Sequence, residues 1–159
     1  LTKAGFKQAT TYINSGNALV RSVLSREETL AKVAEICLKK FKYDRPIFAP
    51  TADEWATVLK RDPFPQKAEG KHVHAVLLAE KPKAEAVAKL QALAVEGESL
   101  KVLPTAIGAY HVCYLHTPHG FGTSKLGGKF DKGIGVENTA RNWNTVVKMD
   151  ELARGLENA

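Results

Sequence analysis

The order in which strand-like and helix-like patterns follow one another constrains the fold of this chain most. Two runs with strand-like alternation lie within Thr10–Arg21, around the turn Asn14-Ser15-Gly16-Asn17. Two more, Ser99–Leu103 and Ala109–His116, adjoin at Gly108. Neighbouring strands of this kind pair as hairpins, whereas a doubly wound sheet requires regular alternation of strands and helices. The sequence therefore predicts an α+β fold.

Helix start signals predict two helices in the first half of the chain. Ser25 with Glu28, and Thr51 with Glu54, form capping boxes, in which a hydroxyl and a carboxylate accept hydrogen bonds from N–H groups at the helix start. The remaining elements that we predict are, in chain order, a strand at Arg45–Ala49, a strand at His72–Ala79, a helix at Pro82–Ala94, a glycine-rich loop at Pro118–Gly135 and a helix from about Thr139 to Leu156.

Composition places the chain among ordinary globular proteins. Its 159 residues are 44% hydrophobic, which suffices for a sizeable core without a metal or a disulfide. Cys37 lies in a helix-like pattern and Cys113 in a strand-like one, so we expect reduced thiols. No apolar run approaches the roughly 20 residues of a membrane span, and no secretory signal opens the chain. We therefore expect a cytoplasmic protein. Because Leu1 is not a start methionine, we also expect residues upstream of it to be missing.

The net charge of +6 is unevenly distributed. Residues 1–49 carry nine basic and four acidic side chains, residues 50–100 carry seven and eight, and residues 101–148 carry six and two. Positive charge therefore coincides with the stretches that concentrate amides and hydroxyls. This favours an anionic partner, although solubility alone explains a charge of this size equally well.

Eight polar or basic residues in these stretches are candidates for ligand binding. Arginine and lysine bind carboxylate or phosphate, and a glycine-rich loop can surround a phosphate with N–H groups. At ~100° per residue, Arg141, Asn144 and Lys148 share one arc of the predicted final helix. For Arg141 the alternative is an ion pair with Glu137. For the candidates in the turn of residues 14–17 it is ordinary turn chemistry, and for Ser124 and Lys125 it is a surface loop without a ligand. The candidates are Asn14, Ser15, Asn17, Ser124, Lys125, Arg141, Asn144 and Lys148.

Asn142 and Trp143 are predicted to belong to a structural polar network instead. On the predicted helix Asn142 projects toward the apolar side, where a buried amide needs hydrogen-bond partners, so we expect it to hold a neighbouring loop. Trp143 lies off the core stripe of this helix. Packing is a commoner role for tryptophan than stacking on a ligand ring.

The histidines do not form a metal site by spacing. His72 and His74 share one strand face, as do His111 and Cys113, but neither pair has a third ligand at a recognisable spacing. No serine, histidine and acid can be assembled into a catalytic triad from spacing alone. The sequence therefore predicts no metal and no cofactor, and it assigns no catalytic residue.

Three segments match, in order, the motifs of a known family. They are the strand and turn Thr11–Asn17, the stretch Gly120–Leu126, and the segment Ala140–Thr145. On these motifs the chain resembles the bacterial domain of unknown function family 1697. The resemblance implies two ferredoxin-like α/β subdomains, 1–66 and 67–159, and no established biochemical function.

Family members usually begin with a strand and a glycine-containing turn, which this chain lacks. If this opening is truly missing, the first sheet lacks a strand and exposes an edge. If it is merely disordered or trimmed, part of any site is missing with it. An exposed edge favours pairing with another chain, so we expect a dimer if the edge is open.

Three functional hypotheses follow. The leading one is a binding module for a phosphate-bearing ligand such as a nucleotide, a phosphosugar or nucleic acid. The second is an enzyme acting on a small anionic substrate, in which Lys125 or Arg141 stabilises developing negative charge. The third is a structural or protein-interaction domain without a ligand. No membrane association is expected.

Overall fold

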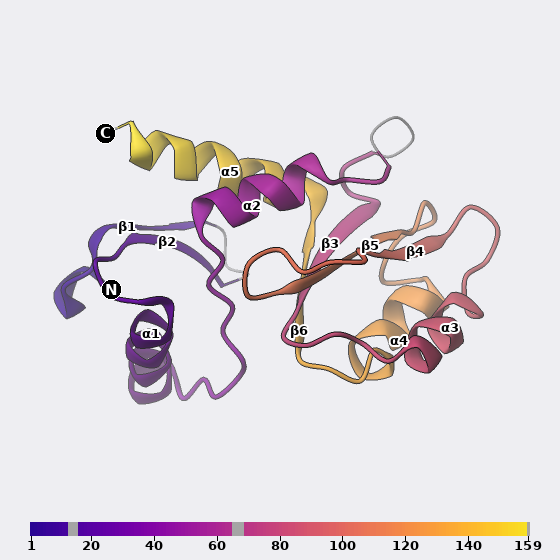
Figure 1. Ribbon diagram of the computed structural model, residues 1–159, viewed down its shortest axis with the longest axis horizontal. Coiled ribbons are helices and arrows are strands. Elements are labelled where there is room, and N and C mark those ends of the chain that lie inside the picture. The colour runs from indigo at the N-terminus through magenta and orange to yellow at the C-terminus, as the bar shows by residue number, and fades with distance from the viewer. Residues whose placement is uncertain (13–15, 65–68, 159) are drawn as a thin grey trace. The chain divides into compact units, whose positions relative to one another are not determined.

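The computed structural model describes residues 1–12, 16–64 and 69–158, which form two compact units. The first comprises Leu1–Ala49 and Met149–Ala159, and the second comprises Pro50–Lys148. Figure 1 shows the chain coloured from its N-terminus to its C-terminus. The boundary predicted between Gln66 and Lys67 falls outside the described residues, so the division into 1–66 and 67–159 stays a prediction.

The first unit contains an antiparallel hairpin, a helix and a short 3-10 turn. The hairpin confirms the two predicted strands, and Tyr12 lies opposite Asn17 across it. The predicted capping box is also present, because the Glu28 N–H donates to Ser25 Oγ and the Ser25 N–H donates to Glu28 Oε2. The elements are η1 (Thr2–Ala4), β1 (Lys7–Tyr12), β2 (Asn17–Arg21) and α1 (Arg26–Phe41).

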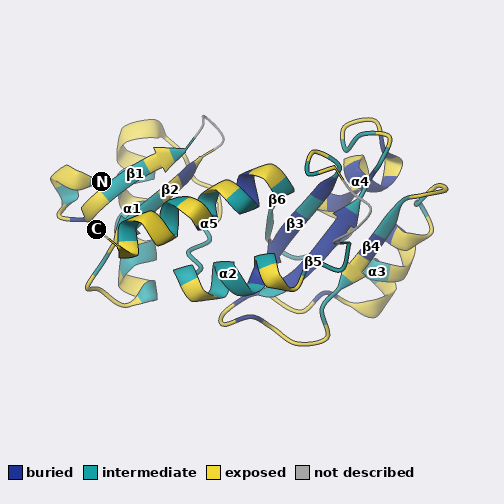
Figure 2. Cartoon of the chain, turned by 90° about the horizontal axis from the view of Figure 1, so that it is seen from above, coloured by how far each residue is buried: buried dark blue, intermediate teal, exposed yellow. Residues whose placement is uncertain are grey.

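The first unit buries few of its apolar side chains. Phe6 is the one buried hydrophobic residue among its described residues, and no side chain of α1 is fully buried. Figure 2 shows α1 in the colours of exposed and intermediate residues. Cys37, on α1, is half-buried and its thiol is free. The exposed large hydrophobic residues of this unit are Val23, Leu24, Leu38, Phe41 and Tyr43.

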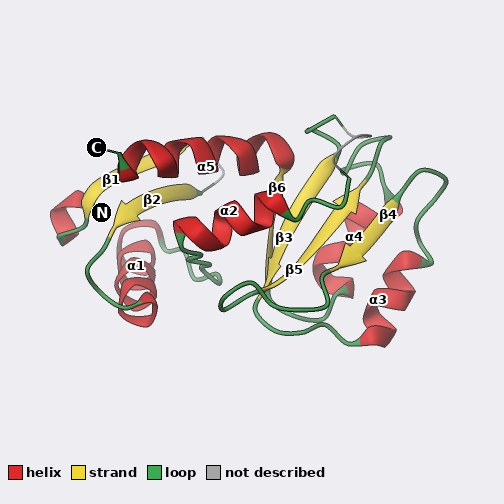
Figure 3. Cartoon of the chain, turned by 45° about the horizontal axis from the view of Figure 1, so that its top comes forward, coloured by secondary structure: helices red, strands yellow, loops and turns green. Residues whose placement is uncertain are grey.

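A four-stranded antiparallel sheet organises the second unit (Figure 3), and with the hairpin it confirms the α+β class. The strand order is β4-β5-β3-β6, so β3 is central. From β3 to β6 the elements follow the β-α-β-β-α-β order of a ferredoxin-like fold; such a fold in both halves stays a prediction. The elements are α2 (Ala52–Lys60), β3 (Val73–Leu78), α3 (Ala84–Gln91), β4 (Ser99–Val102), β5 (His111–His116), α4 (Lys125–Gly133), β6 (Asn138–Asn142) and α5 (Trp143–Glu157), whose last turns belong to the first unit.

Helices cover both faces of this sheet. On one face, α3 and α4 bury Leu90, Leu126 and Phe130 against the sheet, in a cluster that includes the free, fully buried Cys113. Burial raises the pKa of the Cys113 thiol. On the other face, the buried Tyr114 hydroxyl donates to the Val58 carbonyl of α2 at 2.7 Å.

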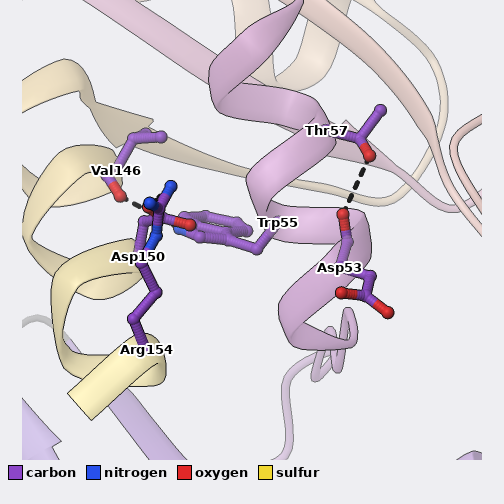
Figure 4. Close-up of polar contacts among 6 residues, drawn as sticks. All are labelled: Asp53, Trp55, Thr57, Val146, Asp150 and Arg154. Carbon is purple, nitrogen blue, oxygen red and sulfur yellow. Dashed lines mark hydrogen bonds and ion pairs between the residues drawn. The ribbon is translucent and has the colours of Figure 1, made fainter. Parts of the chain in front are cut away.

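A hydrogen bond from the Trp55 indole joins α2 to α5. Trp55 Nε1 donates to the Val146 carbonyl at 3.0 Å, as Figure 4 shows. Upstream of Trp55, Thr51 and Glu54 form the second predicted capping box. Further along α5, Arg154 and the buried Asp150 form an ion pair at 2.7 Å.

A helix that crosses a membrane needs a long apolar run, and none of the helices in the described part of the chain has one.

The loop predicted over Pro118–Gly135 is wrong, because this stretch contains α4. Six glycines suggested a loop, since glycine disfavours a helix interior by about 1 kcal/mol per residue. However, Leu126, Phe130 and Ile134 recur every four residues and are all buried. Burying three large apolar side chains stabilises the helix by roughly 1.5–3 kcal/mol each, which outweighs the glycines.

Two further predictions are wrong. The final helix begins at Trp143 rather than near Thr139, because residues 138–142 pair with β3 as the edge strand β6. Arg141 therefore does not share a helical arc with Asn144 and Lys148. The described residues also form no strand at Arg45–Ala49, because an extended segment becomes a strand only when a neighbouring backbone pairs with it along its length.

Candidate functional site

The glycine-rich motif forms a capped helix start in the second unit. Ser124 is the N-cap of α4, and its Oγ accepts a hydrogen bond from the Gly127 N–H at 3.0 Å. Before the cap, the Gly120 N–H donates to the Thr117 carbonyl and the Thr123 hydroxyl donates to the His119 carbonyl. The loop is therefore held by hydrogen bonds of its own.

Three exposed lysines follow the cap on one face of α4. They are Lys125, Lys129 and Lys132, and at ~100° per residue they lie within an arc of about 60°. No acidic residue occupies the first turn of α4. Asp131 lies about 100° outside that arc by the same geometry, and it accepts a hydrogen bond from the Asn138 amide. This face of α4 is thus positively charged from Lys125 at its start to Lys132 in its last turn.

The imidazole of His74 lies beneath the same loop. Its ring stacks on Phe121, with centroids 4.2 Å apart and an interplanar angle of 28°. Burial lowers the pKa of His74 to about 4, so the ring is neutral at neutral pH. The Phe121 backbone packs closely on α4, because a Cβ added at Gly127 would approach the Phe121 carbonyl oxygen to 2.4 Å.

The second motif turns the chain from strand β6 into helix α5. Asn142 ends the strand opposite His74, and its Oδ1 accepts a hydrogen bond from the Thr145 N–H at 3.0 Å. The Trp143 N–H donates to the Gly70 carbonyl at 3.0 Å, and its ring lies 6.3 Å from that of Tyr114. Asn142 therefore serves as an N-cap, while Trp143 packs against the α2 side of the sheet.

Arg141 and Asn142 lie on opposite faces of the sheet, because they are adjacent on one strand. Arg141 Nη1 donates to Thr139 Oγ1 and to the Ala140 carbonyl, both at 2.8 Å. Asn144 and Lys148 are exposed on α5. Arg141 is thus separated from the basic start of α4, which carries Ser124 and Lys125.

The third motif belongs to the first unit. Asn14 and Ser15 lie outside the described residues. Asn17 is buried at the start of β2, and its Nδ2 donates to the Tyr12 carbonyl at 3.3 Å. This hydrogen bond links the two strands of the hairpin at the end next to the turn. Binding roles for the three residues stay predictions.

Sequence reasoning missed Phe121 and Thr117 and considered His74 only as a metal ligand. No local sequence pattern marks these three residues as part of a site, because their burial and cross-strand pairing depend on residues distant in the sequence. Among the described residues, no group of three or more His, Cys, Asp or Glu side chains could hold a metal ion.

Removing the N-cap should destabilise the second unit. We expect Asn142→Ala to lower the free energy of unfolding by about 1 kcal/mol, because the Thr145 N–H loses its acceptor. Asn142→Asp should retain most of the stability, since a carboxylate also caps and suits the helix dipole. Urea unfolding measures both. Equal losses in the two variants, or a loss as large in the exposed control Asn158→Ala, would contradict the capping role.

The buried His74 should make stability depend on pH. Its folded pKa of about 4 lies below the ordinary 6.5, so the unfolded state binds more protons between these values. The free energy of unfolding should therefore fall as the pH falls from about 6.5 to about 4. We expect the urea midpoint to drop between about pH 7 and pH 5, and His74→Gln to reduce this drop.

The pKa values of Glu28, Glu35 and Glu69 are lowered from 4.5, so these groups titrate below that window. The exposed His119 provides the control. A wild-type midpoint that does not change with pH, or a His119→Gln variant that reduces the drop as much as His74→Gln, would contradict the prediction.

Comparisons with known proteins agree with the fold. A solved structure, described as conserved bacterial protein SP0830 from Streptococcus pneumoniae, is similar with a TM-score of 0.67 and 15% sequence identity. The similarity covers 96% of this chain and 84% of that one, and at this identity it concerns the fold alone. No curated protein sequence matches the chain. The model of the family described as "Protein of unknown function (DUF1697)" matches residues 1–107, so the chain belongs to the DUF1697 family.

Proposed function

We propose that the protein binds a phosphate-bearing anion at the start of α4. The observation that carries this proposal is Lys125 with Lys129 one turn later, next to a capped helix N-terminus without acidic residues. Lys132 continues the same face into the last turn. A helix N-terminus directs backbone N–H groups and a partial positive charge toward a ligand. Three ammonium groups on one face add donors suited to phosphate oxygens.

Nucleotides, phosphosugars and nucleic acid all offer this chemistry. An enzyme acting on a small anion receives less support, because a general base works best with a pKa near the operating pH. The His74 imidazole, with a pKa of about 4, would be a weak base. The proposal is therefore one of binding.

Charge removal on α4 tests the proposal. We expect Lys125→Gln with Lys129→Gln to weaken binding of the responding ligand at least about tenfold, because a hydrogen bond to a charged group contributes about 1.5–3 kcal/mol. Calorimetric titrations with inorganic phosphate, adenosine monophosphate, ribose 5-phosphate and a short single-stranded RNA measure it. For the RNA, the slope of log affinity against log salt should also fall by about 0.7 per lost contact.

The matched control is Lys81→Gln with Lys83→Gln, which removes the same charge from exposed positions of the same unit. Equal weakening by control and test pairs would show general charge attraction and contradict a site on α4. Absence of binding to all four probes would contradict the proposed function itself.

The first unit favours a second candidate function, assembly into a homodimer through α1. Leu38 and Phe41 are 50% and 73% exposed, and they lie three residues apart on one helix face. Both residues lie in the last turns of α1 (Arg26–Phe41). Two copies packed with these apolar pairs in contact about a two-fold axis would remove them from water.

Dimerisation should depend on this apolar face. We expect sedimentation equilibrium to show a concentration-dependent dimer, and Leu38→Ser with Phe41→Ser to shift it to monomer, because the apolar area buried between the copies is lost. Val95→Ser, at a 55% exposed position of the second unit, is the control. A monomer at all concentrations, or equal dissociation of the control, would contradict this candidate.

A further inference from the structure

Two buried polar atoms beneath the loop of residues 117–124 have no hydrogen-bond partner among the described residues. They are Oγ1 of Thr117, a fully buried residue, and Nδ1 of His74. The neighbouring hydroxyls of Thr123 and Ser124 both form hydrogen bonds. An unsatisfied buried donor or acceptor destabilises a fold, so an isolated pair of them indicates a missing partner.

Strand register places these two side chains on the same face of the sheet. The Thr117 N–H donates to the His72 carbonyl at 2.9 Å, which extends the β3–β5 ladder by one residue pair beyond Val73 and His116. Thr117 therefore lies opposite His72 and diagonal to His74, on the α4 face. Diagonal neighbours on one face lie roughly 7–8 Å apart. The Cβ atoms of such a pair lie somewhat closer than this, and one small group with two hydrogen bonds of roughly 2.9 Å joins polar atoms up to about 5.8 Å apart.

The surroundings favour an uncharged group. The Phe121 ring covers the His74 imidazole, and the buried Leu115 lies directly opposite His74 on β5. A charge in such a desolvated position would be strongly unfavourable without a charged partner. Neutral imidazole offers one donor and one acceptor nitrogen, and threonine offers both functions on one oxygen. A hydroxyl, which also donates and accepts, complements this pair.

We propose that an uncharged hydroxyl group binds between His74 Nδ1 and Thr117 Oγ1, beneath the loop that precedes α4. The group is either an ordered water molecule or a hydroxyl of a bound sugar-like ligand. This subsite is independent of the phosphate site, since it uses neither a lysine nor the helix N-terminus.

Replacing the threonine hydroxyl by a methyl group tests the proposal. If the bridging group is present, Thr117→Val deprives it of a partner, and the equilibrium constant for unfolding should rise about fivefold or more. Without a bridging group, the same change removes an unsatisfied hydroxyl and should leave stability equal or higher. The exposed Thr105→Val variant controls for the general effect of this replacement. Stability of Thr117→Val equal to or above that of the wild type would overturn the proposal.

A second variant tests the same proposal independently, in case Thr117→Val does not fold. His74→Phe retains a ring for stacking on Phe121 but removes Nδ1, and it should also raise the unfolding constant about fivefold or more at pH 7. A His74→Phe protein as stable as the wild type would overturn the proposal equally.

Nuclear magnetic resonance distinguishes the two sources of the hydroxyl. A cross-relaxation signal between the His74 ring and a long-lived water, lost in Thr117→Val, supports ordered water. A shift of the His74 Nδ1 resonance on adding ribose, absent with inorganic phosphate and lost in Thr117→Val, supports a ligand hydroxyl. If neither signal appears in the wild type, the proposal is overturned.

Discussion

The antiparallel pairing of β6 with β3 is the interaction on which the candidate site depends. Because Asn142 lies opposite His74 in this ladder, the last residue of the strand is fixed at the point where α5 must begin. The strand also separates Arg141 and Asn142 onto opposite faces. One set of backbone hydrogen bonds thus decides where a helix starts and which motif residues can cooperate.

Local signals explain which parts of the fold could be predicted from the sequence. Both capping boxes are made within four residues, so Ser25 with Glu28 and Thr51 with Glu54 identified helix starts correctly. The hairpin around the first motif is equally local. Residues 138–142 were misassigned because their strand conformation depends on β3, whose paired residues lie 60 or more positions earlier in the chain.

Residue chemistry alone singled out Ser124 and Lys125, but it predicted neither the helix that they begin nor its surroundings. Ser124 and Lys125 belong to a recognisable motif, and the structure makes them the cap and first residue of a helix. Thr117 carries no such signal, because its full burial arises from the loop that folds over the end of the sheet. The six glycines of the region concealed the helix, since their backbone preference opposed the apolar spacing that determined it.

The positions of the two cysteines give each unit a built-in chemical reporter. Cys113 lies in the buried sheet of the second unit, and its raised pKa keeps it as a thiol, which is the unreactive form. Cys37 lies half-buried on α1 of the first unit. An alkylating reagent can therefore reach Cys113 only when the sheet opens, whereas Cys37 is accessible through local motion of a sparsely packed helix. The rates of modification at the two sites separate the opening of one unit from that of the other.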